Sequence, residues 1–375
     1  MNKSPLRLRE KPLPGITHGY SLSDSLLIRF FNRLCSLPEQ ALTWPWTRKI
    51  PIDRPIFIIG HFRSGTTVLE QIIAEHPKVG YFTYQTNVWD RSPVLGYLTT
   101  RFMWATGILD RDPIPPVHNP RLLITNLSPF ECEWIWSKSK DNLWDDRVTD
   151  LTIGAEFSDP DFERYICSLI KQHLLMRRAN RFLNKNPVNA LRIGYLHKIF
   201  PDARFVNIIR NPLNLVVSHY RTAQREDKVF FATERTRRIF SDCCHLDVLQ
   251  MRLKTRNYAR TLALNQEHPL LGIASQWADT QQCVLDAKEA DPTLAAAIYE
   301  FHYEELISRQ KVILDGLWEF IGLADEHAHR ITDSYVDRLT PPPEVELTDE
   351  ERAYLPRVQE IVAPVAAKLG YTTLI

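Results

Sequence analysis

The apolar positions of this chain follow two spacings, and the change from one to the other marks its first predicted strand and helix. Residues 56–59 form a short, wholly apolar run that ends at Gly60. Such a run is typical of a strand buried on both faces of a parallel sheet. Apolar residues then recur at helical spacing, at Val68, Leu69, Ile72 and Ile73. We therefore expect a strand over residues 56–59, a turn, and a helix immediately after it.

The same order returns in the middle of the chain. Residues 181–185 and 205–209 are predicted strands, and the segment 187–200 between them carries apolar residues at helical spacing. Two strands joined by a helix form a βαβ unit, whose crossover is expected to be right-handed. Further helices are predicted over residues 213–220 and before Gly322, which is expected to end the last of them.

Strands that alternate with helices predict an α/β fold with a parallel sheet. The chain has 375 residues, of which 44% are hydrophobic, and this is enough to bury one large core. We expect a single domain over residues 55–375. Residues 1–54 are rich in proline and basic residues, so we expect them to form an extended N-terminal arm.

Within that arm, residues 25–37 combine apolar and basic side chains, which favours an amphipathic helix. Packing of this helix on the domain is the first interpretation, and peripheral contact with a membrane is the alternative. No apolar run approaches the roughly 18 residues needed to span a bilayer, and the N-terminus does not resemble a signal sequence. A cytoplasmic protein is therefore expected.

Charge and cysteine content narrow the function classes. The net charge of +1 creates no overall field that attracts nucleic acid, so nucleic acid is not an expected partner. The six cysteines are scattered, without the paired spacing of a zinc site or the density of a disulfide scaffold. Scattered histidines and cysteines predict no metal site. Any anionic ligand must therefore be held by a local group of residues.

Residues 60–67, Gly-His-Phe-Arg-Ser-Gly-Thr-Thr, join the first predicted strand to its helix. A glycine-bearing turn at this place aims successive backbone N–H groups at a phosphate and so forms an anion cradle. Its glycines have the spacing of the nucleotide triphosphatase loop, but Thr66 and Thr67 replace the lysine and the magnesium-binding residue of that loop. This argues against ATP or GTP hydrolysis. Arg63 supplies a permanent cation inside the turn.

The run Arg63-Ser64-Gly65-Thr66-Thr67 after an apolar strand resembles the 5'-phosphosulfate loop of the sulfotransferases that use PAPS, 3'-phosphoadenosine 5'-phosphosulfate. The resemblance implies a P-loop-like, three-layer α/β fold with a central parallel sheet flanked by helices. It also implies that these five residues hold the 5'-phosphate of PAPS as co-substrate, with Arg63 near the transferred group.

A second motif lies at the end of the strand 205–209. Arg210 ends this strand, and Ser218 follows eight residues later in the next helix. Open α/β sheets bind ligands at this edge. The spacing resembles the 3'-phosphate motif of the same family, which implies that Arg210 and Ser218 grip the phosphate that distinguishes PAPS from ATP. Trp277 stands where relatives carry an aromatic residue that stacks on adenine, and a place in the core is the alternative.

Lys185 ends the strand 181–185 and so points at the same edge, where its ammonium group can neutralise charge on the oxygen that leaves sulfur. The segment 184–187 resembles the tyrosylprotein sulfotransferase branch, in which this lysine is catalytic, although Asn186 replaces an aspartate. That branch uses a glutamate just after the first helix, and residues 81–85 contain no carboxylate. Sulfation of protein tyrosine by that arrangement is not expected.

The proton of an attacking hydroxyl needs a base within hydrogen-bond reach. Many bacterial relatives carry an acidic segment after a proline-rich loop, and residues 128–133 resemble it. Glu131 is the first candidate, Glu133 the second, and His118 in the loop the third, although an acidic helix start explains the two glutamates equally well. The predicted catalytic residues are therefore Lys185, Arg63 and Glu131.

The expected activity is in-line transfer of a sulfuryl group from PAPS to a hydroxyl or amine, with release of adenosine 3',5'-bisphosphate. The acceptor stays open among a carbohydrate, a lipid, a small metabolite and a peptide. The alternatives are a P-loop-type kinase for a small molecule, which Thr66 opposes, and a non-catalytic nucleotide-binding module. Candidate aromatic residues for the acceptor pocket, most of which core packing also explains, are Tyr81, Tyr84, Trp89, Trp134 and Trp136.

Overall fold

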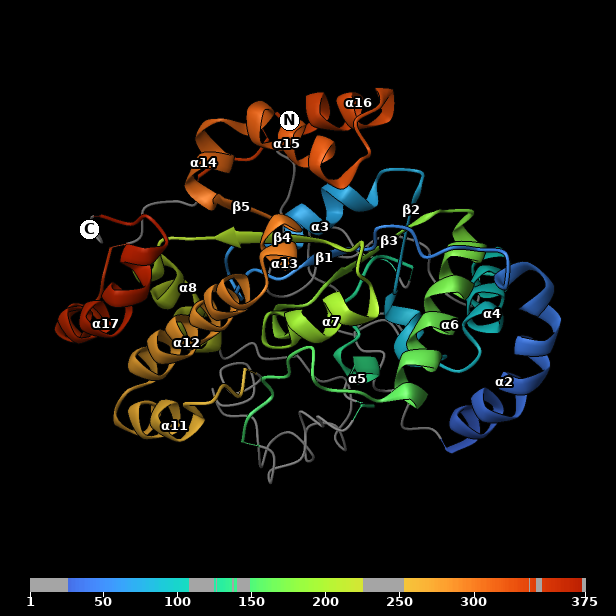
Figure 1. Ribbon diagram of the computed structural model, residues 1–375, viewed down its shortest axis with the longest axis horizontal. Coiled ribbons are helices and arrows are strands. Elements are labelled where there is room, and N and C mark those ends of the chain that lie inside the picture. The colour runs from blue at the N-terminus through green and yellow to red at the C-terminus, as the bar shows by residue number, and fades with distance from the viewer. Residues whose placement is uncertain are drawn as a thin grey trace, which may run out of the picture.

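A parallel sheet of five strands lies at the centre of the computed structural model (Figure 1). The structure describes residues 26–107, 125, 127–136, 138–139, 149–224, 253–336, 338–341 and 346–372. The strands are β1 (Ile56–Ile58), β2 (Val79–Tyr81), β3 (Arg181–Lys185), β4 (Arg204–Ile209) and β5 (Ile298–His302), in the spatial order β2-β3-β1-β4-β5. Each neighbouring pair is parallel, which confirms the predicted α/β class.

Helices cover both faces of the sheet, because both faces of the central strand are apolar. Phe57 of β1 packs in one hydrophobic cluster, and Ile56 and Ile58 pack in another. The first cluster includes residues of α6 (Pro160–Arg177) and α7 (Ile193–Ile199), and the second includes residues of α3 (Thr66–Ala74), α15 (Gln310–Ile321) and α16 (Glu326–Tyr335). Figure 1 shows α15 and α16 above the sheet and α7 below it. The three-layer P-loop-like arrangement is confirmed.

A third group of helices packs beside the end of β4, at the left of Figure 1. It contains α8 (Pro212–Gln224), α11 (Tyr258–Glu267), α12 (Pro269–Ala290) and α17 (Asp349–Lys368). The remaining helical elements are η1 (Tyr84–Asn87), α4 (Pro93–Ala105), α5 (Glu133–Trp136), η2 (Pro187–Arg192), α13 (Pro292–Ala296) and α14 (Tyr303–Ser308). Helix α8 carries one of the predicted phosphate ligands, so this group supports one side of the site.

The bounds of the predicted strands agree with the structure to within one residue. Strand β3 has the predicted bounds, and Gly322 ends α15 in the left-handed conformation. The predicted helix 187–200 is divided into a 3-10 helix, η2, and α7. Strands β3 and β4 are not neighbours, because β1 lies between them. Strands β2 and β5 were not predicted, since β2 has three residues and the edge strand β5 mixes polar and apolar residues.

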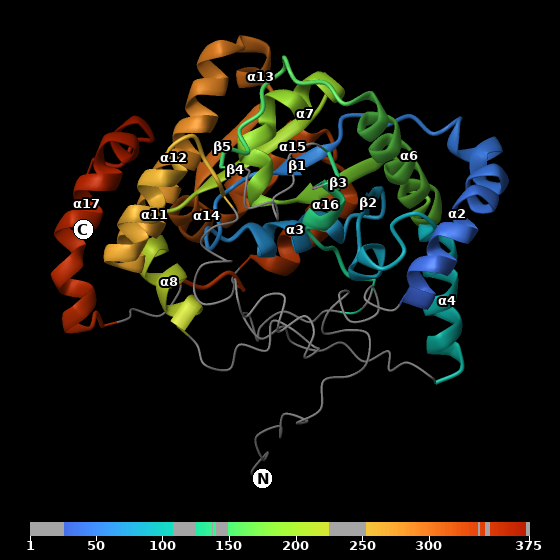
Figure 2. The same cartoon turned by 90° about the horizontal axis from the view of Figure 1, so that it is seen from below.

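Residues 26–47 form the helix α2 (Leu26–Thr47), so the prediction of an extended arm is wrong for this stretch. The helix predicted within residues 25–37 is confirmed from Leu26 onward, and it packs against α4 and α6 (Figure 2). The buried residues that make this packing possible are polar. In the described part of the chain, no helix combines the length and the apolar character needed to cross a membrane.

Candidate active site

The loop between β1 and α3 is a tight turn held by its own hydrogen bonds. The N–H and the hydroxyl of Ser64 both donate to the carbonyl oxygen of His61, at 3.2 and 2.5 Å. Gly60 lies so close to β4 that a Cβ added there would be 2.6 Å from the carbonyl oxygen of Ile208. Gly65 has a φ of 96° and begins α3 without a side-chain cap. The first turn of α3 thus offers its N–H groups to an anion.

Arg63 connects the two predicted phosphate-binding motifs. Its Nε donates to Oγ of Ser218 at 3.4 Å, and its carbonyl oxygen accepts a hydrogen bond from Nη1 of Arg210 at 2.8 Å. Its φ of 68° lies in the left-handed region, which non-glycine residues adopt mainly at turns and functional sites. The structure therefore brings the loop and the second motif together at the carboxyl ends of β1 and β4.

Arg210 is the second cation of this edge. It follows the last residue of β4, and its guanidinium lies over the ring of Tyr303, 4.9 Å from the ring centroid. Burial lowers the pKa of Arg210, and the neighbouring Tyr303 and Glu304 oppose that effect. A guanidinium keeps its charge even so. Because it is partly shielded from water, its attraction for an anion is stronger than that of a surface arginine.

Lys185 ends β3 beside the end of β1, where the loop begins. Lys185 is paired with Ile58 in the sheet, and the N–H of Asn186 donates to the carbonyl oxygen of Ile58 at 3.1 Å. The ammonium group is almost fully buried and forms an ion pair with the carboxylate of Glu131. The side chain of Asn184 donates to the backbone carbonyl of Glu131 at 3.1 Å. Two of the predicted catalytic residues are thus in direct contact.

The two glutamates considered as bases have different partners. Cys132, which separates them, is buried and has a left-handed φ of 51°. Both carboxylate oxygens of Glu133 accept hydrogen bonds from Nη2 of Arg192, at 2.9 and 2.8 Å, and Asn186 donates to the same carboxylate. Glu133 and Arg192 are both buried. A carboxylate held in this way serves the structure rather than the acceptor, which favours Glu131 over Glu133 as the candidate base.

Glu70 is a buried carboxyl group beside Lys185 that the sequence analysis missed. It lies on α3, one turn after Thr66, and only 3% of the residue is exposed. The backbone of Lys185 donates a hydrogen bond to its carboxylate. Burial raises the pKa of Glu70 to about 7; the charge of Lys185 opposes this rise and that of Glu131 adds to it. Its burial could have been predicted from the sequence, because position 70 shares a helix face with Thr66 and Ile73.

Comparison with known proteins decides the class of this chain. The family model described as "Sulfotransferase family" matches residues 55–327. The chain belongs to the sulfotransferase family. It is an enzyme that transfers a sulfuryl group, and the matched range contains the loop, Lys185, Arg210 and Ser218.

Relatives of this sulfotransferase cover most of its length. An "Omega-hydroxy-beta-dihydromenaquinone-9 sulfotransferase Stf3" of Mycobacterium bovis is 23% identical over 358 residues, which cover 85% of this chain and 76% of the relative. The crystal structure of sulfotransferase STF9 from Mycobacterium avium has a TM-score of 0.54 at 15% identity, covering 88% of this chain and 81% of that one. The crystal structure of sulfotransferase STF1 from Mycobacterium tuberculosis has a TM-score of 0.50 at 16% identity, covering 93% of this chain and 87% of that one. These two structures share the fold.

The structure of the sulfotransferase corrects the prediction for Trp277. Its side chain is fully buried on α12, in the cluster that also contains Leu215 and Val216. Stacking on adenine requires an exposed ring face, which this tryptophan does not have. Trp277 is therefore a core residue, the alternative that the sequence also allowed.

Two histidines near the loop and the remaining candidate side chains have different positions. His61, inside the loop, is fully buried, and the centroid of its ring lies 6.0 Å from that of His219. Burial lowers the pKa of His61 to about 4 and the pKa of His219 well below its usual value. Both are therefore neutral packing residues at pH 7. Trp136 is buried in the core, as core packing predicts. His118 and the side chain of Trp134 lie outside the described residues. Where the structure describes the chain, no three side chains of His, Cys, Asp or Glu are grouped so as to hold a metal ion.

The raised pKa of Glu70 predicts a pH-dependent stability of the sulfotransferase. In the unfolded chain this carboxyl ionises near its ordinary pKa of 4.5, whereas in the folded enzyme it keeps its proton up to about pH 7. Between these values the folded state binds more protons, so the contribution of Glu70 to the free energy of unfolding falls as pH rises. The fall amounts to about 3 kcal/mol and is complete above pH 7.

Glu70→Gln should remove this contribution. The variant should gain stability relative to the wild-type chain at pH 8, and the gain should shrink toward zero at pH 4.5. Urea unfolding at the two pH values measures both differences. Glu289→Gln, an exposed position on α12, is the matched control and should leave the pH dependence as it is. An equal change in stability at both pH values would contradict the buried, proton-holding role of Glu70.

Proposed function

We propose that this sulfotransferase transfers the sulfuryl group of PAPS to a hydroxyl group of a lipid. One observation carries the donor assignment: Arg63 contacts both Ser218 and Arg210, with Lys185 one strand away. Two adjacent anion sites fit a nucleotide that carries a phosphosulfate on its 5' side and a phosphate on its 3' side. ATP lacks the second of these groups.

Each part of the site has a role in holding the donor. The loop residues 64–67 bind the 5'-phosphate with backbone N–H groups and hydroxyls, and the guanidinium of Arg63 adds a cation near the sulfonate. Arg210 and Ser218 bind the 3'-phosphate. The contact between Arg63 and Ser218 sets these two phosphate sites next to each other. A donor bound in this way has its sulfuryl group directed toward Lys185 and Glu131.

Transfer breaks the bond between sulfur and the bridging oxygen of PAPS and forms a bond between sulfur and the acceptor oxygen, in line. Lys185 donates to the bridging oxygen, where negative charge grows as the bond breaks. The proton of the acceptor hydroxyl passes to Glu131, and adenosine 3',5'-bisphosphate leaves. Lys185 and Glu131 form an ion pair before the donor binds. The anionic donor attracts Lys185, which frees Glu131 to accept the proton.

A lipid alcohol as acceptor is supported by a relative and by the side chains near the carboxylates. The Mycobacterium bovis relative is named for an omega-hydroxylated dihydromenaquinone. Next to Glu131, the ring of Phe130 packs on that of Tyr84 with 4.2 Å between centroids. Aromatic side chains beside a few polar groups are typical of sites for such molecules.

We also infer that the enzyme works in the cytoplasm. Cys35, Cys132, Cys167 and Cys283 are free thiols, as a reducing compartment would keep them. The net charge of +1 supports small anions and lipids rather than nucleic acid as partners. The likeness of residues 184–187 to the tyrosylprotein branch stays a prediction.

Thermal denaturation tests the donor site. Adenosine 3',5'-bisphosphate should raise the melting temperature with increasing concentration, because it binds the folded state. Neither ADP nor ATP with magnesium should do so to the same extent. Arg210→Ala should weaken bisphosphate binding by about ten- to a hundredfold, since it removes a charged hydrogen-bond partner. Arg204→Ala, at the opposite end of β4, is the matched control and should keep the response.

The donor assignment and the acceptor assignment are overturned by different results. If ATP with magnesium stabilised the protein as well as the bisphosphate does, and Arg210→Ala left both responses intact, a kinase would become the better interpretation. The acceptor is tested separately, by incubation with labelled PAPS and a hydroxylated isoprenoid quinol in micelles, beside a sugar and a tyrosine peptide. Label found only in the water-soluble acceptors would exclude the lipid acceptor and leave the donor site standing.

A further inference from the structure

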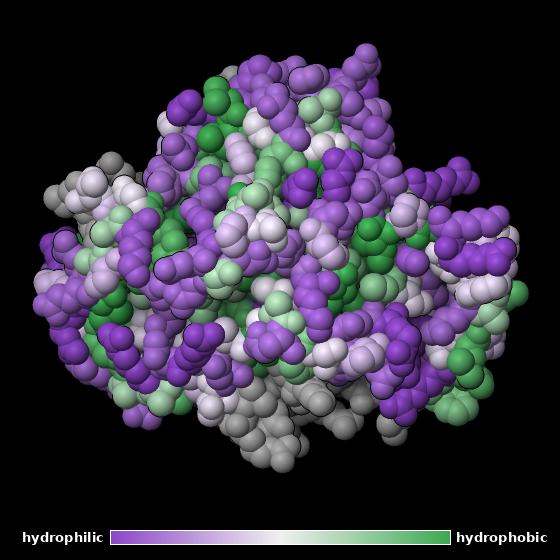
Figure 3. All heavy atoms as spheres, viewed as in Figure 1, coloured by the Kyte–Doolittle hydropathy of each residue, from purple (hydrophilic) through white to green (hydrophobic). Residues whose placement is uncertain are grey.

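Exposed apolar side chains are concentrated on two neighbouring helices. Where the structure describes the chain, all large apolar residues reported as well exposed lie on α2 or α4, with the exception of Val312. Those on α2 are Phe30, Phe31, Leu34, Leu37, Leu42, Trp44 and Trp46, and those on α4 are Leu98 and Phe102. We call these nine residues the apolar surface. Figure 2 shows α2 and α4 side by side at the right edge of the molecule, and Figure 3 shows hydrophobic residues there.

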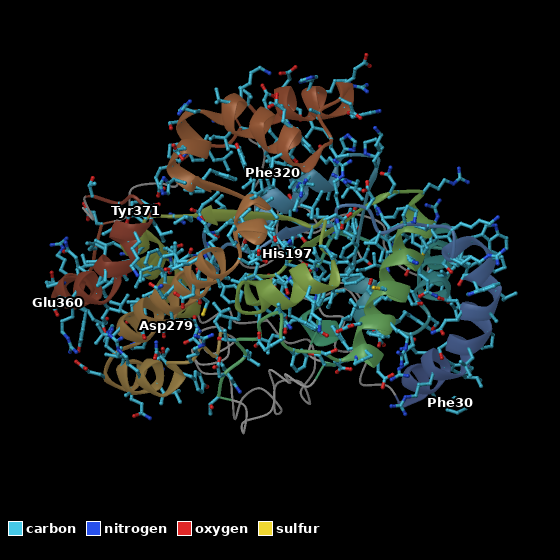
Figure 4. The ribbon with its side chains drawn as sticks, viewed as in Figure 1. Phe30, His197, Asp279, Phe320, Glu360 and Tyr371 are labelled. Carbon is cyan, nitrogen blue, oxygen red and sulfur yellow. The ribbon has the colours of Figure 1, made fainter. Side chains whose placement is uncertain are left out.

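Helix α2 is amphipathic, but it buries its polar face and exposes its apolar face. Its buried residues are polar, namely Asn32, Glu39 and Thr43, which recur along one face. A helix on the surface of a globular protein normally buries its apolar stripe and exposes its polar one. Here the apolar side chains point outward, and Phe30 lies at the outer end of the helix, away from the sheet (Figure 4).

Specific hydrogen bonds hold α2 in this orientation. The side chain of Asn32 donates to Asp90 at 2.8 Å and accepts from the N–H of Ser92 at 3.1 Å. The carboxylate of Glu39 accepts from the N–H groups of Val94 and Leu95, at 3.0 and 2.8 Å. Glu39 thereby caps the first turn of α4, where a negative charge is stabilised. The outward position of the apolar surface is thus built into the fold.

The exposed charges on α2 and α4 themselves are positive. Residues 30–49 and 93–107 contain no exposed acidic residue, since their single carboxylate, Glu39, is buried. Exposed cations in these segments are Arg33, Arg48, Lys49 and Arg101. The guanidinium of Arg48 lies 4.6 Å from the centroid of the Trp44 ring. Apolar and aromatic side chains bordered by cations match the chemistry of an anionic lipid surface, in which tryptophan prefers the headgroup level.

We propose that α2 and α4 dock this enzyme on the anionic face of a lipid bilayer, with the apolar surface inserted among the headgroups. A second copy of the chain is a poorer partner, because a symmetric contact would place the same four cations opposite one another. Docking goes beyond the proposed function, since it does not depend on the donor. It also rests on that function in one respect: a lipid acceptor would lie in the bilayer on which the enzyme docks.

Vesicle flotation tests the proposal with the full chain. The wild-type protein should float with vesicles of phosphatidylcholine and phosphatidylglycerol, and binding should fall as salt is added or as phosphatidylglycerol is left out. The triple variant Leu34→Ser, Leu37→Ser and Leu42→Ser should bind at least about tenfold more weakly. Arg33→Gln with Lys49→Gln should lower binding by about fivefold for each charge removed. Val312→Ser, an equally exposed apolar position on α15, should bind like the wild type.

The outcomes separate docking from the proposed function. All variants are first tested for the melting-temperature rise with adenosine 3',5'-bisphosphate, which reports an intact fold and donor site. Wild-type protein that shows this rise but does not float with anionic vesicles would overturn the docking proposal alone. Light scattering provides the second check: a wild-type dimer that the triple variant converts into a monomer would assign the apolar surface to a second copy of the chain.

Discussion

Replacement of Lys185 by methionine should lower kcat about a hundred- to a thousandfold while adenosine 3',5'-bisphosphate still binds. The lysine ends β3 at the edge where the loop and Arg210 meet, so its ammonium group can reach the oxygen that leaves sulfur. Its interaction strengthens as charge grows on that oxygen, and such an interaction lowers the barrier more than it improves binding. Steady-state kinetics with PAPS measures kcat and KM separately.

Stability must be separated from catalysis in this experiment, because Lys185→Met removes the ammonium group that pairs with the carboxylate of Glu131. The double variant with Glu131→Gln removes that charge and should recover the melting temperature but not kcat. Glu131→Gln alone should lower kcat and remove the acidic limb of the pH–rate profile, as expected of a general base. Lys311→Met, at an exposed position on α15, is the matched control. A Lys185→Met enzyme with unchanged kcat would exclude the proposed role.

Arg192→Met should destabilise the enzyme by about 3–5 kcal/mol. Arg192 holds both oxygens of the buried Glu133 carboxylate, at 2.8 and 2.9 Å. Without the guanidinium, the buried carboxylate would lose both of these charged hydrogen bonds, which costs more than the ion pair itself contributes. Urea unfolding should show a lower midpoint with an unchanged m value.

The partner variant distinguishes a structural Glu133 from a catalytic one. Adding Glu133→Gln to Arg192→Met should restore part of the stability, because the buried charge is then gone. Glu133→Gln alone should keep kcat near the wild-type value at a temperature where the variant is folded. Arg330→Met, an exposed position on α16, should change stability by no more than about 0.5 kcal/mol. A folded Glu133→Gln variant that has lost its activity would make Glu133 the better candidate for the base.

Local chemistry made the donor loop predictable. A wholly apolar strand, two glycines and an arginine within eight residues specify a turn whose N–H groups face an anion, and none of this needs a distant partner. The apolar run of β1 was also predictable, since burial on both faces leaves no polar position in it. The edge strand β5 escaped prediction because it is only partly buried and so tolerates polar residues.

The sequence by itself determined the class of fold, the anion-binding loop and the separate positions of Lys185, Arg210 and Ser218, because each depends on residues that are near one another in the chain. Only the tertiary structure decided which of these residues meet. Placing β1 between β3 and β4 brings Arg63 to Ser218 and Lys185 close to the loop.

The tertiary structure also decided between alternatives that composition left equal. Glu131 and Glu133 are two residues apart, yet one pairs with Lys185 and the other with Arg192. Trp277 is a core residue because α12 packs between α8 and α17. The orientation of α2 depends on hydrogen bonds that Asn32 and Glu39 accept from residues more than 50 positions away. Each of these contacts joins residues that are far apart in the chain. Local residue spacing therefore cannot predict them.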